Sequence, residues 1–419
     1  MKRRVVVTGL GVVTSLSQDV EDLWRRLLAG ESGIHHLECV ETDLFKVKIG
    51  GDVHDWDPSA VIDHREAKRI DRFTQFAIVA GTKAVEDSGL DFGNEDVHRC
   101  GVVLGSGIGG LNEIETQVGR LLNKGPDRVS PMTIPKLMLN AAGGNLAIRL
   151  GLRGPNFAVA TACASANNAM GDALQMIQNG ISEIVVTGGS EAAMTGMGIS
   201  AFQNMKALSR RNDEPARASR PFDVDRDGFV LSEGAGILIF EELEHALARN
   251  AKIYCEVIGY GASCDAGHIT QPDPAGMGAS KAMQNALDDA NLAPEDVQYL
   301  NAHGTSTPLG DKAETQAVKG VFGEHAYNLN ISSTKSSLGH SLGASGGIEL
   351  VITAKAIENQ EIPPTINLEN QDPDCDLNYT PNTPQKRDLN IAMSLSLIHI
   401  SEPTRPERIA AGGGSFKKK

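Results

Sequence analysis

Short runs of apolar residues alternate along this chain with longer stretches in which apolar positions recur every three or four residues. The short runs predict buried β-strands, and the longer stretches predict helices that cover them. The predicted strands are Arg4–Thr8, Gly101–Leu104, Phe157–Ala160, Glu183–Thr187, Gly236–Phe240, Ile253–Tyr260, Tyr299–Ala302 and Leu389–Met393. The predicted helices are Phe73–Ser88, Pro135–Leu150, Ala164–Asn179, Gly278–Ala290, Asp311–Phe322 and Gly346–Glu358. Apolar strands separated by helices indicate an α/β fold with mostly parallel sheets covered on both faces.

The same pattern divides the chain into three parts. A polar, turn-rich stretch at Ser209–Glu233 interrupts the alternation, which starts again near Glu241. We therefore expect two similar halves, residues 1–250 and 251–394. Residues 395–419 read LSLIHISEPTRPERIAAGGGSFKKK and show no period. We interpret this tail as aberrant, the product of a translated sequencing adapter or a frameshift.

Composition narrows the class of protein. Of the 419 residues 41% are apolar and 22% are charged, so the chain can bury a large core without disulfides or metal. The net charge of −14 argues against binding to nucleic acid and against adsorption to anionic membranes. We expect neither as a partner.

The N-terminus and the cysteines indicate the cellular compartment of the protein. The start MKRRVVVTGLGVV resembles a signal peptide only superficially, because its apolar part is short and interrupted by glycine. We interpret it as a buried first strand and turn. No run of about 18 apolar residues follows, so no transmembrane helix is expected. The six cysteines are scattered without a CxxC pair, which favours a reduced, cytoplasmic location.

One cysteine stands where a nucleophile would be useful. The apolar run NFAVA leads through Thr161 and Ala162 to Cys163, and a predicted helix follows directly. Unpaired N–H groups at a helix N-terminus favour negative charge, so we expect a lowered thiol pKa at Cys163 and a reactive thiolate. The same amides could bind an oxyanion. A buried structural cysteine fits this pattern equally well.

Two histidine motifs follow. His303 ends a predicted strand in NAHGTSTPLGD, where a histidine faces either a cleft or a hydrogen-bonded turn. His340 ends TKSSLGH, just before a glycine-rich helix start and close to Lys335. Glu349 falls within an otherwise apolar helix. It is either exposed to solvent or buried with a partner, for which the Lys335 region is the obvious candidate.

In this order, the motifs TACAS, NAHGTSTPLGD and TKSSLGH resemble the β-ketoacyl-[acyl-carrier-protein] synthases, a family of thiolase-fold condensing enzymes. The resemblance covers about residues 1–394 and extends to VVVTGLGVVT, RPFDVDRDGFVLSEGAG and IPPTINLE. Within this family, the chain most resembles the elongating synthases. Its length and its motifs are most similar to those of the synthase II type. The resemblance implies a layered α-β-α-β-α fold of two pseudo-symmetric halves. It also implies a cytoplasmic homodimer that works with acyl carrier protein and needs neither cofactor nor metal.

The resemblance further implies residue roles in fatty-acid chain elongation. Cys163 would attack an acyl thioester, and His303 and His340 would stabilise the enolate formed when malonyl-carrier protein loses CO₂. Lys335 and Glu349 would orient His340. The positions assigned to substrate binding are Ile108, Thr270, Thr305 and Thr307. The positions assigned to carrier-protein docking are Arg65, Lys68 and Arg69, for which a solvated helix face is the alternative.

The chain departs from the family at its end. Family members end in a strand and loop close to NSFGFGGTN, and here LSLIHISEPTRP stands in that place. We expect the change to leave a sheet edge unpaired and to remove one oxyanion donor, a loss of about 10²–10³ in kcat. Asp223–Gly228 opens like a calcium loop but lacks the acidic twelfth residue, so no metal is expected.

Three alternatives to fatty-acid elongation stay open to different degrees. A polyketide-type ketosynthase carries the same motifs. A non-catalytic partner that binds carrier protein is favoured by the altered C-terminus but opposed by Cys163. A thiolase is disfavoured, because the pair His303 and His340 already fills the synthase pattern.

Overall fold

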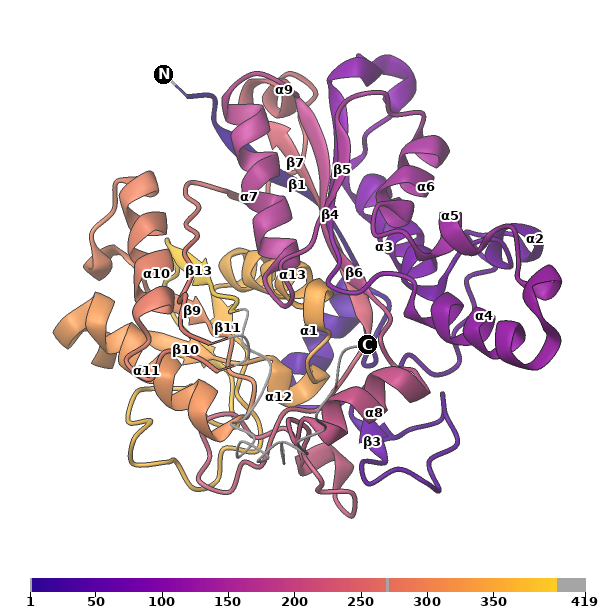
Figure 1. The fold of residues 1–419 in the computed structure, drawn as a ribbon. Helices are drawn as coiled ribbons and strands as arrows, with labels where there is room; N and C mark the ends of the chain where they lie inside the picture. The colour runs from indigo at the N-terminus through magenta and orange to yellow at the C-terminus, as the bar shows by residue number, and fades with distance from the viewer. Residues whose placement is uncertain (1, 269–270, 398–419) are drawn as a thin grey trace, which may run out of the picture.

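The computed structural model describes residues 2–268 and 271–397, which form an α/β fold (Figure 1). The strands are β1 (Val5–Val13), β2 (His35–His36), β3 (Ile49–Gly50), β4 (Cys100–Gly105), β5 (Asn156–Val159), β6 (Ile184–Glu191), β7 (Gly234–Glu242), β8 (Cys255–Glu256), β9 (Tyr299–Asn301), β10 (Asn330–Ser332), β11 (Glu361–Ile362), β12 (Gln385–Lys386) and β13 (Ala392–Ser394). The helices are α1 (Val20–Leu28), α2 (His64–Ala67), α3 (Arg72–Ser88), α4 (Leu111–Lys124), α5 (Thr133–Leu137), α6 (Ala141–Leu150), α7 (Ser165–Gln178), α8 (Gly196–Asn204), α9 (Leu243–Ala248), α10 (Met277–Ala290), α11 (Pro308–Phe322), α12 (Lys335–Leu338) and α13 (Ser345–Asn359).

A six-stranded sheet in the order β5-β4-β6-β7-β1-β8 forms the larger β-layer. Strands β5, β4 and β6 are parallel, whereas β7 is antiparallel to both β6 and β1. The prediction of mostly parallel sheets is therefore wrong for this part of the fold. The chain returns to β7 through the long stretch after α8, and an antiparallel neighbour needs no crossover helix. Because β7 is buried along nearly its whole length, its apolar pattern gave no sign of its direction.

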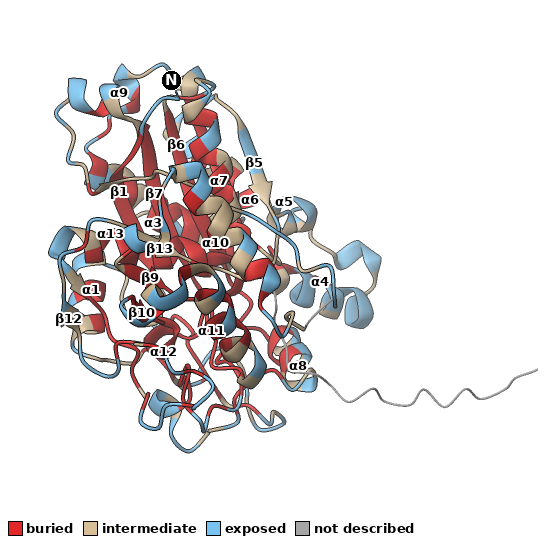
Figure 2. Cartoon of the chain, turned by 90° about the vertical axis from the view of Figure 1, so that its left-hand side faces the viewer, coloured by how far each residue is buried: buried red, intermediate tan, exposed pale blue. Residues whose placement is uncertain are grey.

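A second sheet and three helical layers complete the architecture. Strands β10, β9 and β13 form a parallel sheet. Helices α3 and α6 cover one face of the larger sheet, α7 and α13 lie between the two sheets, and α10 and α11 cover the smaller sheet (Figure 1). Buried residues concentrate in and around the sheets (Figure 2). The predicted layered α-β-α-β-α class is confirmed.

Several element boundaries differ from the sequence prediction. The predicted helix Pro135–Leu150 is two helices, because Met138 adopts an extended backbone (φ −61°, ψ 137°) between α5 and α6. The predicted strand Ile253–Tyr260 is regular only at β8, which pairs with β1. Helix α4 was not predicted. The division of the chain at residue 250 stays a prediction.

The hairpin of β2 and β3 leads to a buried carboxylate that pairs with a histidine. His35 Nε2 lies 3.0 Å from Asp52 Oδ1, and His35 Nδ1 lies 3.1 Å from the carbonyl oxygen of Gly33. The hydrogen bond to Asp52 raises the pKa of His35 above its usual 6.5. Burial alone would raise the pKa of Asp52, but the hydrogen bond and charge of His35 together with backbone amides outweigh burial and leave that pKa below its ordinary value.

We expect His35→Gln to lower the free energy of unfolding by about 1–2 kcal/mol near pH 6, where His35 is charged. Because the folded-state pKa of His35 is raised, its contribution is complete below pH 6.5 and is lost as the pH rises through that raised value. Urea unfolding of both proteins between pH 5.5 and 9 measures the difference. His36→Gln, on the exposed neighbour in β2, is the control. A difference that does not change with pH would refute the ion-pair account.

Candidate active site

Cys163 lies in a sharp turn between β5 and α7. Ala162, directly before it, has a φ of 49°, which is uncommon for a residue with a side chain and marks a constrained turn. Helix α7 approaches β4 so closely that a Cβ on Gly105 would lie 2.3 Å from the amide nitrogen of Ala166. The thiol of Cys163 is therefore fixed in place, and the residue is completely buried.

The structure brings Cys163, His303 and His340 together. His303 follows β9 and His340 follows α12, and ligand atoms of the three side chains lie within 4.8 Å of one another. His340 Nε2 is 2.9 Å from Cys163 Sγ. The two imidazole rings meet edge to face, with centroids 5.4 Å apart. A nucleophile, a base at hydrogen-bond distance and a second imidazole thus share one buried site.

A buried carboxylate fixes the loop that carries His303. Glu314 on α11 accepts hydrogen bonds from the backbone N–H groups of His303 and Gly304, each at 2.7 Å. Burial raises the pKa of Glu314 to about 7, although the Gly304 amide opposes this. Sequence reasoning missed this residue. The available signal was an acidic side chain beside Ala313 and Ala317, on the buried face of α11.

The surroundings of His340 contain one hydrogen-bond partner and one buried ion pair. His340 Nδ1 lies 2.9 Å from Ser345 Oγ at the start of α13. Lys335 forms an ion pair with Glu349, and both side chains are 3% exposed. Burial raises the pKa of Glu349 to about 7, and the Lys335 ammonium opposes this rise. The sequence placed Lys335 and Glu349 near His340, whereas it gave no indication of Ser345.

The protonation state of the site differs from the sequence expectation. Burial raises the pKa of Cys163 to about 12, although the charge of Lys335 opposes this rise. The expected lowering of this pKa is therefore wrong: α7 begins two residues after Cys163, and the loss of water outweighs the helix terminus. Burial and the charge of Lys335 hold the pKa of His340 well below its usual range. A neutral thiol thus faces a neutral imidazole, which can accept its proton during attack.

Ile108 lies in the loop after β4 and packs against the apolar cluster that includes Cys163. A second buried carboxylate, Glu191 at the end of β6, holds this loop in place. Its oxygens accept hydrogen bonds from Ser106 Oγ and from the backbone amides of Gly107, Ile108, Gly109 and Gly343. Sequence reasoning missed Glu191 as well, although an acidic residue that ends a buried apolar strand was a usable signal.

The other predicted binding residues have different outcomes. Thr305 and Thr307 are buried in the loop after His303, with their hydroxyl oxygens 3.1 Å apart. Thr270 lies outside the described residues. Arg65, Lys68 and Arg69 lie in and just after α2, and all three are exposed on the surface.

Cys163, His303 and His340 form the one cluster in residues 2–268 and 271–397 whose ligand atoms could converge on a metal ion. Two of those atoms, Cys163 Sγ and His340 Nε2, are already hydrogen-bonded to each other. The carboxylate of Asp223, at the start of the calcium-like segment, is occupied by Arg220 and by backbone amides. Within the described residues no helix is long and apolar enough to cross a membrane.

Comparison with known proteins gives consistent matches along the chain. The family model described as "Beta-ketoacyl synthase, N-terminal domain" matches residues 2–246, and "Beta-ketoacyl synthase, C-terminal domain" matches residues 254–369. A curated relative, the 3-oxoacyl-[acyl-carrier-protein] synthase 2 of Synechocystis sp., is 50% identical over 395 residues, which cover 94% of this chain and 95% of the relative.

Solved structures show the same architecture. The ishigamide ketosynthase/chain length factor superposes with a TM-score of 0.88 at 34% identity, over 94% of this chain and 96% of that chain. A type II polyketide synthase acyl-carrier protein in complex with its ketosynthase, AntDE:AntF, gives a TM-score of 0.87 at 35% identity with the same coverage.

Proposed function

This chain belongs to the β-ketoacyl synthase family, and we propose that it elongates fatty-acid chains as a 3-oxoacyl-[acyl-carrier-protein] synthase. The reaction joins an acyl group held on the enzyme to malonyl-[acyl-carrier-protein] and releases CO₂. The observation that carries the proposal is the convergence of Cys163, His303 and His340 within 4.8 Å in a buried site. A thioester acyl transfer needs a nucleophile, a proton acceptor and hydrogen-bond donors, and this group of residues can supply all three.

The first step in this proposal is acyl transfer to Cys163. Sγ attacks the thioester carbonyl, and its proton passes to His340 Nε2, which lies 2.9 Å away. The bond to the pantetheine sulfur breaks, and the departing thiolate takes up that proton. Burial favours this neutral pathway, because it raises the pKa of Cys163 to about 12 and lowers that of His340.

The second step forms the new carbon–carbon bond. Malonyl-carrier protein loses CO₂, and the electron pair of the broken bond forms an enolate on the thioester. The N–H of His303 would donate to the enolate oxygen, and His340 would do so in the tautomer that carries its proton on Nε2. The enolate carbon then attacks the acyl carbonyl on Cys163, and the Cys163 thiolate leaves and takes up a proton that comes from water. Ser345 and Glu314 would act as positioning residues, because Ser345 bonds to His340 and Glu314 bonds to the backbone of His303. The ion pair of Lys335 and Glu349 would act on His340 through the charge of Lys335.

The test is intact-mass measurement after incubation with a long-chain acyl-[acyl-carrier-protein]. We expect the mass to rise by one acyl group on Cys163, and malonyl-carrier protein should then convert that group to the 3-oxoacyl product. A version of the chain that ends in a GFGGTN-type loop is the matched comparison. Acylation of both with slower turnover by this chain is the expected outcome. Acylation of neither would contradict the proposal.

A polyketide-type ketosynthase is the second candidate, because the superposed structures include ketosynthases of that type. The products separate the two functions: a fatty-acid synthase makes one condensation per acyl chain until the ketone is reduced, whereas the polyketide type condenses repeatedly. A non-catalytic carrier-protein partner would show no acylation at all.

The partner in this proposal is acyl carrier protein, docked at Arg65, Lys68 and Arg69 in the cytoplasm. These side chains are exposed around α2, and they form a basic cluster on a chain whose net charge is −14. An acidic carrier protein would be attracted to this cluster and repelled by most of the remaining surface.

We also propose that the chain divides into two halves at residue 250, with Cys163 in the first half and both histidines in the second.

We further propose a homodimer formed through the β5 edge. Strand β5 ends the larger sheet, so one of its edges has no strand neighbour in the described part of the chain. Figure 2 shows β5 and the nearby helices α4 and α5 along one side of the molecule. This side exposes large apolar residues, which a monomer rarely leaves uncovered. They include Leu122, Ile134 and Phe157, whose exposed fractions are 78%, 60% and 38%.

Phe157→Arg should weaken the dimer by roughly 30-fold or more, because it places a charge in the centre of the proposed apolar contact. Sedimentation velocity over a concentration series measures the dissociation constant. Leu247→Arg, which alters an exposed leucine on α9, is the matched control and should leave the constant unchanged. Equal effects of the two substitutions would place the interface elsewhere.

A further inference from the structure

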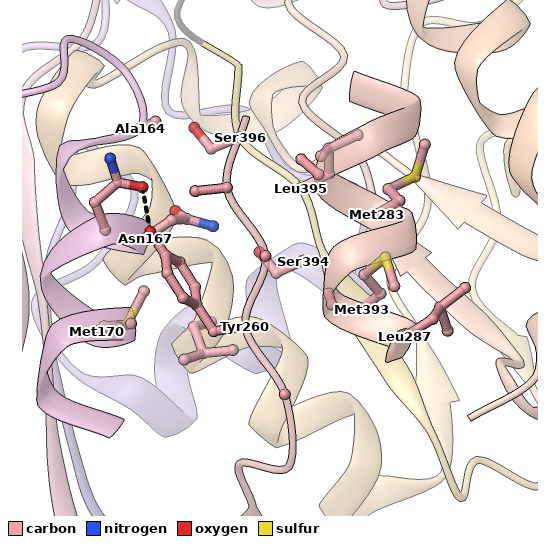
Figure 3. A pocket seen from close by; sticks show the side chains of 18 of the residues that line it. Ala164, Asn167, Met170, Tyr260, Met283, Leu287, Met393, Ser394, Leu395 and Ser396 are labelled. Atoms are coloured by element: carbon pink, nitrogen blue, oxygen red, sulfur yellow. Dashed lines mark hydrogen bonds between the residues drawn. The ribbon is translucent and has the colours of Figure 1, made fainter. Parts of the chain in front are cut away.

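Tyr260 connects two helices that are far apart in the sequence. Its backbone N–H donates to Asp289 Oδ2 of α10 at 3.2 Å, and its hydroxyl donates to Asn168 Oδ1 of α7 at 2.8 Å. Figure 3 shows the Tyr260 side chain directed at α7. Helix α7 begins two residues after Cys163, so Tyr260 links the helical layer outside the smaller sheet to the helix that follows the nucleophile.

Two glycines fix the place of Tyr260 between these helices. A Cβ on Gly261 would lie 2.1 Å from the carbonyl oxygen of Ala282 in α10, so the backbone next to Tyr260 rests directly on that helix. On the opposite side, a Cβ on Gly171 of α7 would lie 2.4 Å from the Tyr260 ring. The ring therefore occupies the space that a larger residue of α7 would fill, and Tyr260 can shift toward neither helix.

Hydrogen bonds continue from Tyr260 to the turn that carries the nucleophile. The Asn168 side chain contacts Tyr260 with Oδ1, and its Nδ2 donates to Thr161 Oγ1 at 2.9 Å. The Thr161 carbonyl accepts from the Ala164 N–H at 3.0 Å, and this bond closes the turn around Cys163. Three side chains thus connect α10 to the residue two positions before Cys163.

The turn has a backbone conformation that needs support. Ala162 has a φ of 49°, and a residue with a side chain keeps such a conformation only where its surroundings hold it there. Ser165 supports the turn from within, since its Oγ accepts from the Thr161 N–H at 2.9 Å and donates to the Ala162 carbonyl at 2.6 Å. Asn168 supports it from outside through the Thr161 hydroxyl. Loss of the outer support would let the turn relax and would move Cys163 Sγ.

We propose that Tyr260 is a positioning residue for the nucleophile, which acts through Asn168 and Thr161 to hold Cys163 Sγ at its distance from His340. This inference deepens the proposed function and rests on it, because it concerns the acylation of Cys163. A tyrosine suits this role, since its ring is rigid and spans the space between two helices with only two rotatable bonds. Burial raises the pKa of the Tyr260 hydroxyl, which therefore keeps its proton.

The test is the rate of Cys163 acylation by long-chain acyl-[acyl-carrier-protein], followed by intact mass on the full chain over a series of carrier concentrations. Tyr260→Phe removes one oxygen and keeps the ring. It should lower the maximal rate about 10-fold, because a small displacement of reacting atoms has an effect of this order. The half-saturating concentration should stay within about two-fold, because binding of the carrier protein does not involve the turn. Tyr254→Phe is the matched control: it removes the hydroxyl of a buried tyrosine bonded to Asp87, and it should leave the acylation rate unchanged.

A double-mutant cycle tests the route through Thr161. Thr161→Val removes the hydroxyl at the far end of the hydrogen bonds and should slow acylation to a similar degree. Adding Tyr260→Phe to Thr161→Val should then slow the reaction by less than about two-fold, because the connection is already broken. A maximal rate of Tyr260→Phe equal to that of the unaltered chain, or effects of the two substitutions that multiply, would overturn this inference and leave the proposed function standing. Absence of acylation in the unaltered chain would overturn both.

Discussion

Cys163→Ser should abolish the acyl-enzyme and slow condensation by roughly 10⁴-fold or more, the scale seen when one member of a nucleophile–base pair is removed. A serine hydroxyl holds its proton more tightly than a thiol. The site increases that difficulty, because burial already raises the pKa of the Cys163 thiol to about 12. The neutral His340 imidazole is too weak a base to activate an alcohol without a carboxylate partner of its own, and its Nδ1 is hydrogen-bonded to the hydroxyl of Ser345.

Intact mass after incubation with acyl-carrier protein measures the acyl-enzyme, and product formation from malonyl-carrier protein measures condensation. Cys264→Ser, which alters an exposed cysteine, is the matched control and should be acylated like the unaltered chain. Size-exclusion chromatography should show the same oligomeric state for both variants, because Cys163 lies in a buried turn and not on the β5 edge proposed as an interface. Acylation of Cys163→Ser at more than a few per cent of the normal rate would exclude Cys163 as the nucleophile.

The sequence predicted the local features of this site better than its environment. Cys163, His303 and His340 stand in short motifs where a strand or turn changes into another element, and such positions can be identified from residue types alone. The burial of Glu191 and Glu314 had a signal in the sequence, but their partners had none, because these are backbone amides of other loops. The pKa of Cys163 was predicted in the wrong direction for the same reason. The helix start is visible in the sequence, whereas complete burial depends on the tertiary structure.

The fold shows the same division between local and non-local information. Long helices such as α3 and α7 were predicted to within one residue at each end, since their apolar period extends over several turns. The direction of β7 was not predictable, because a strand buried on both faces has the same apolar pattern in either direction. The strand expected at Ile253–Tyr260 is regular only at β8, because β1 provides a neighbour for two residues.

Lys335→Met should destabilise the protein by about 3–5 kcal/mol, because it leaves the Glu349 carboxyl buried without its counter-ion. The loss should grow with pH. Burial raises the folded-state pKa of Glu349 to about 7 even with Lys335 present, and removal of the ammonium raises it further. A carboxyl that binds its proton more tightly in the folded state lowers the free energy of unfolding as the pH rises above its unfolded value of about 4.5. Urea unfolding between pH 5 and 9 measures both effects.

The double variant Lys335→Met, Glu349→Leu separates stability from catalysis. Replacing both ions by apolar side chains should restore most of the lost free energy and remove its pH dependence. Acylation should stay several-fold slow, because the charge of Lys335 lowers the pKa of Cys163 by more than the charge of Glu349 raises it, and apolar side chains replace neither effect. Lys355→Met is the matched control, since Lys355 is a buried lysine paired with Glu21 and Glu358. It should lose stability without slower acylation. Normal acylation by the double variant would mean that the Lys335–Glu349 pair supports the fold and does not tune the nucleophile.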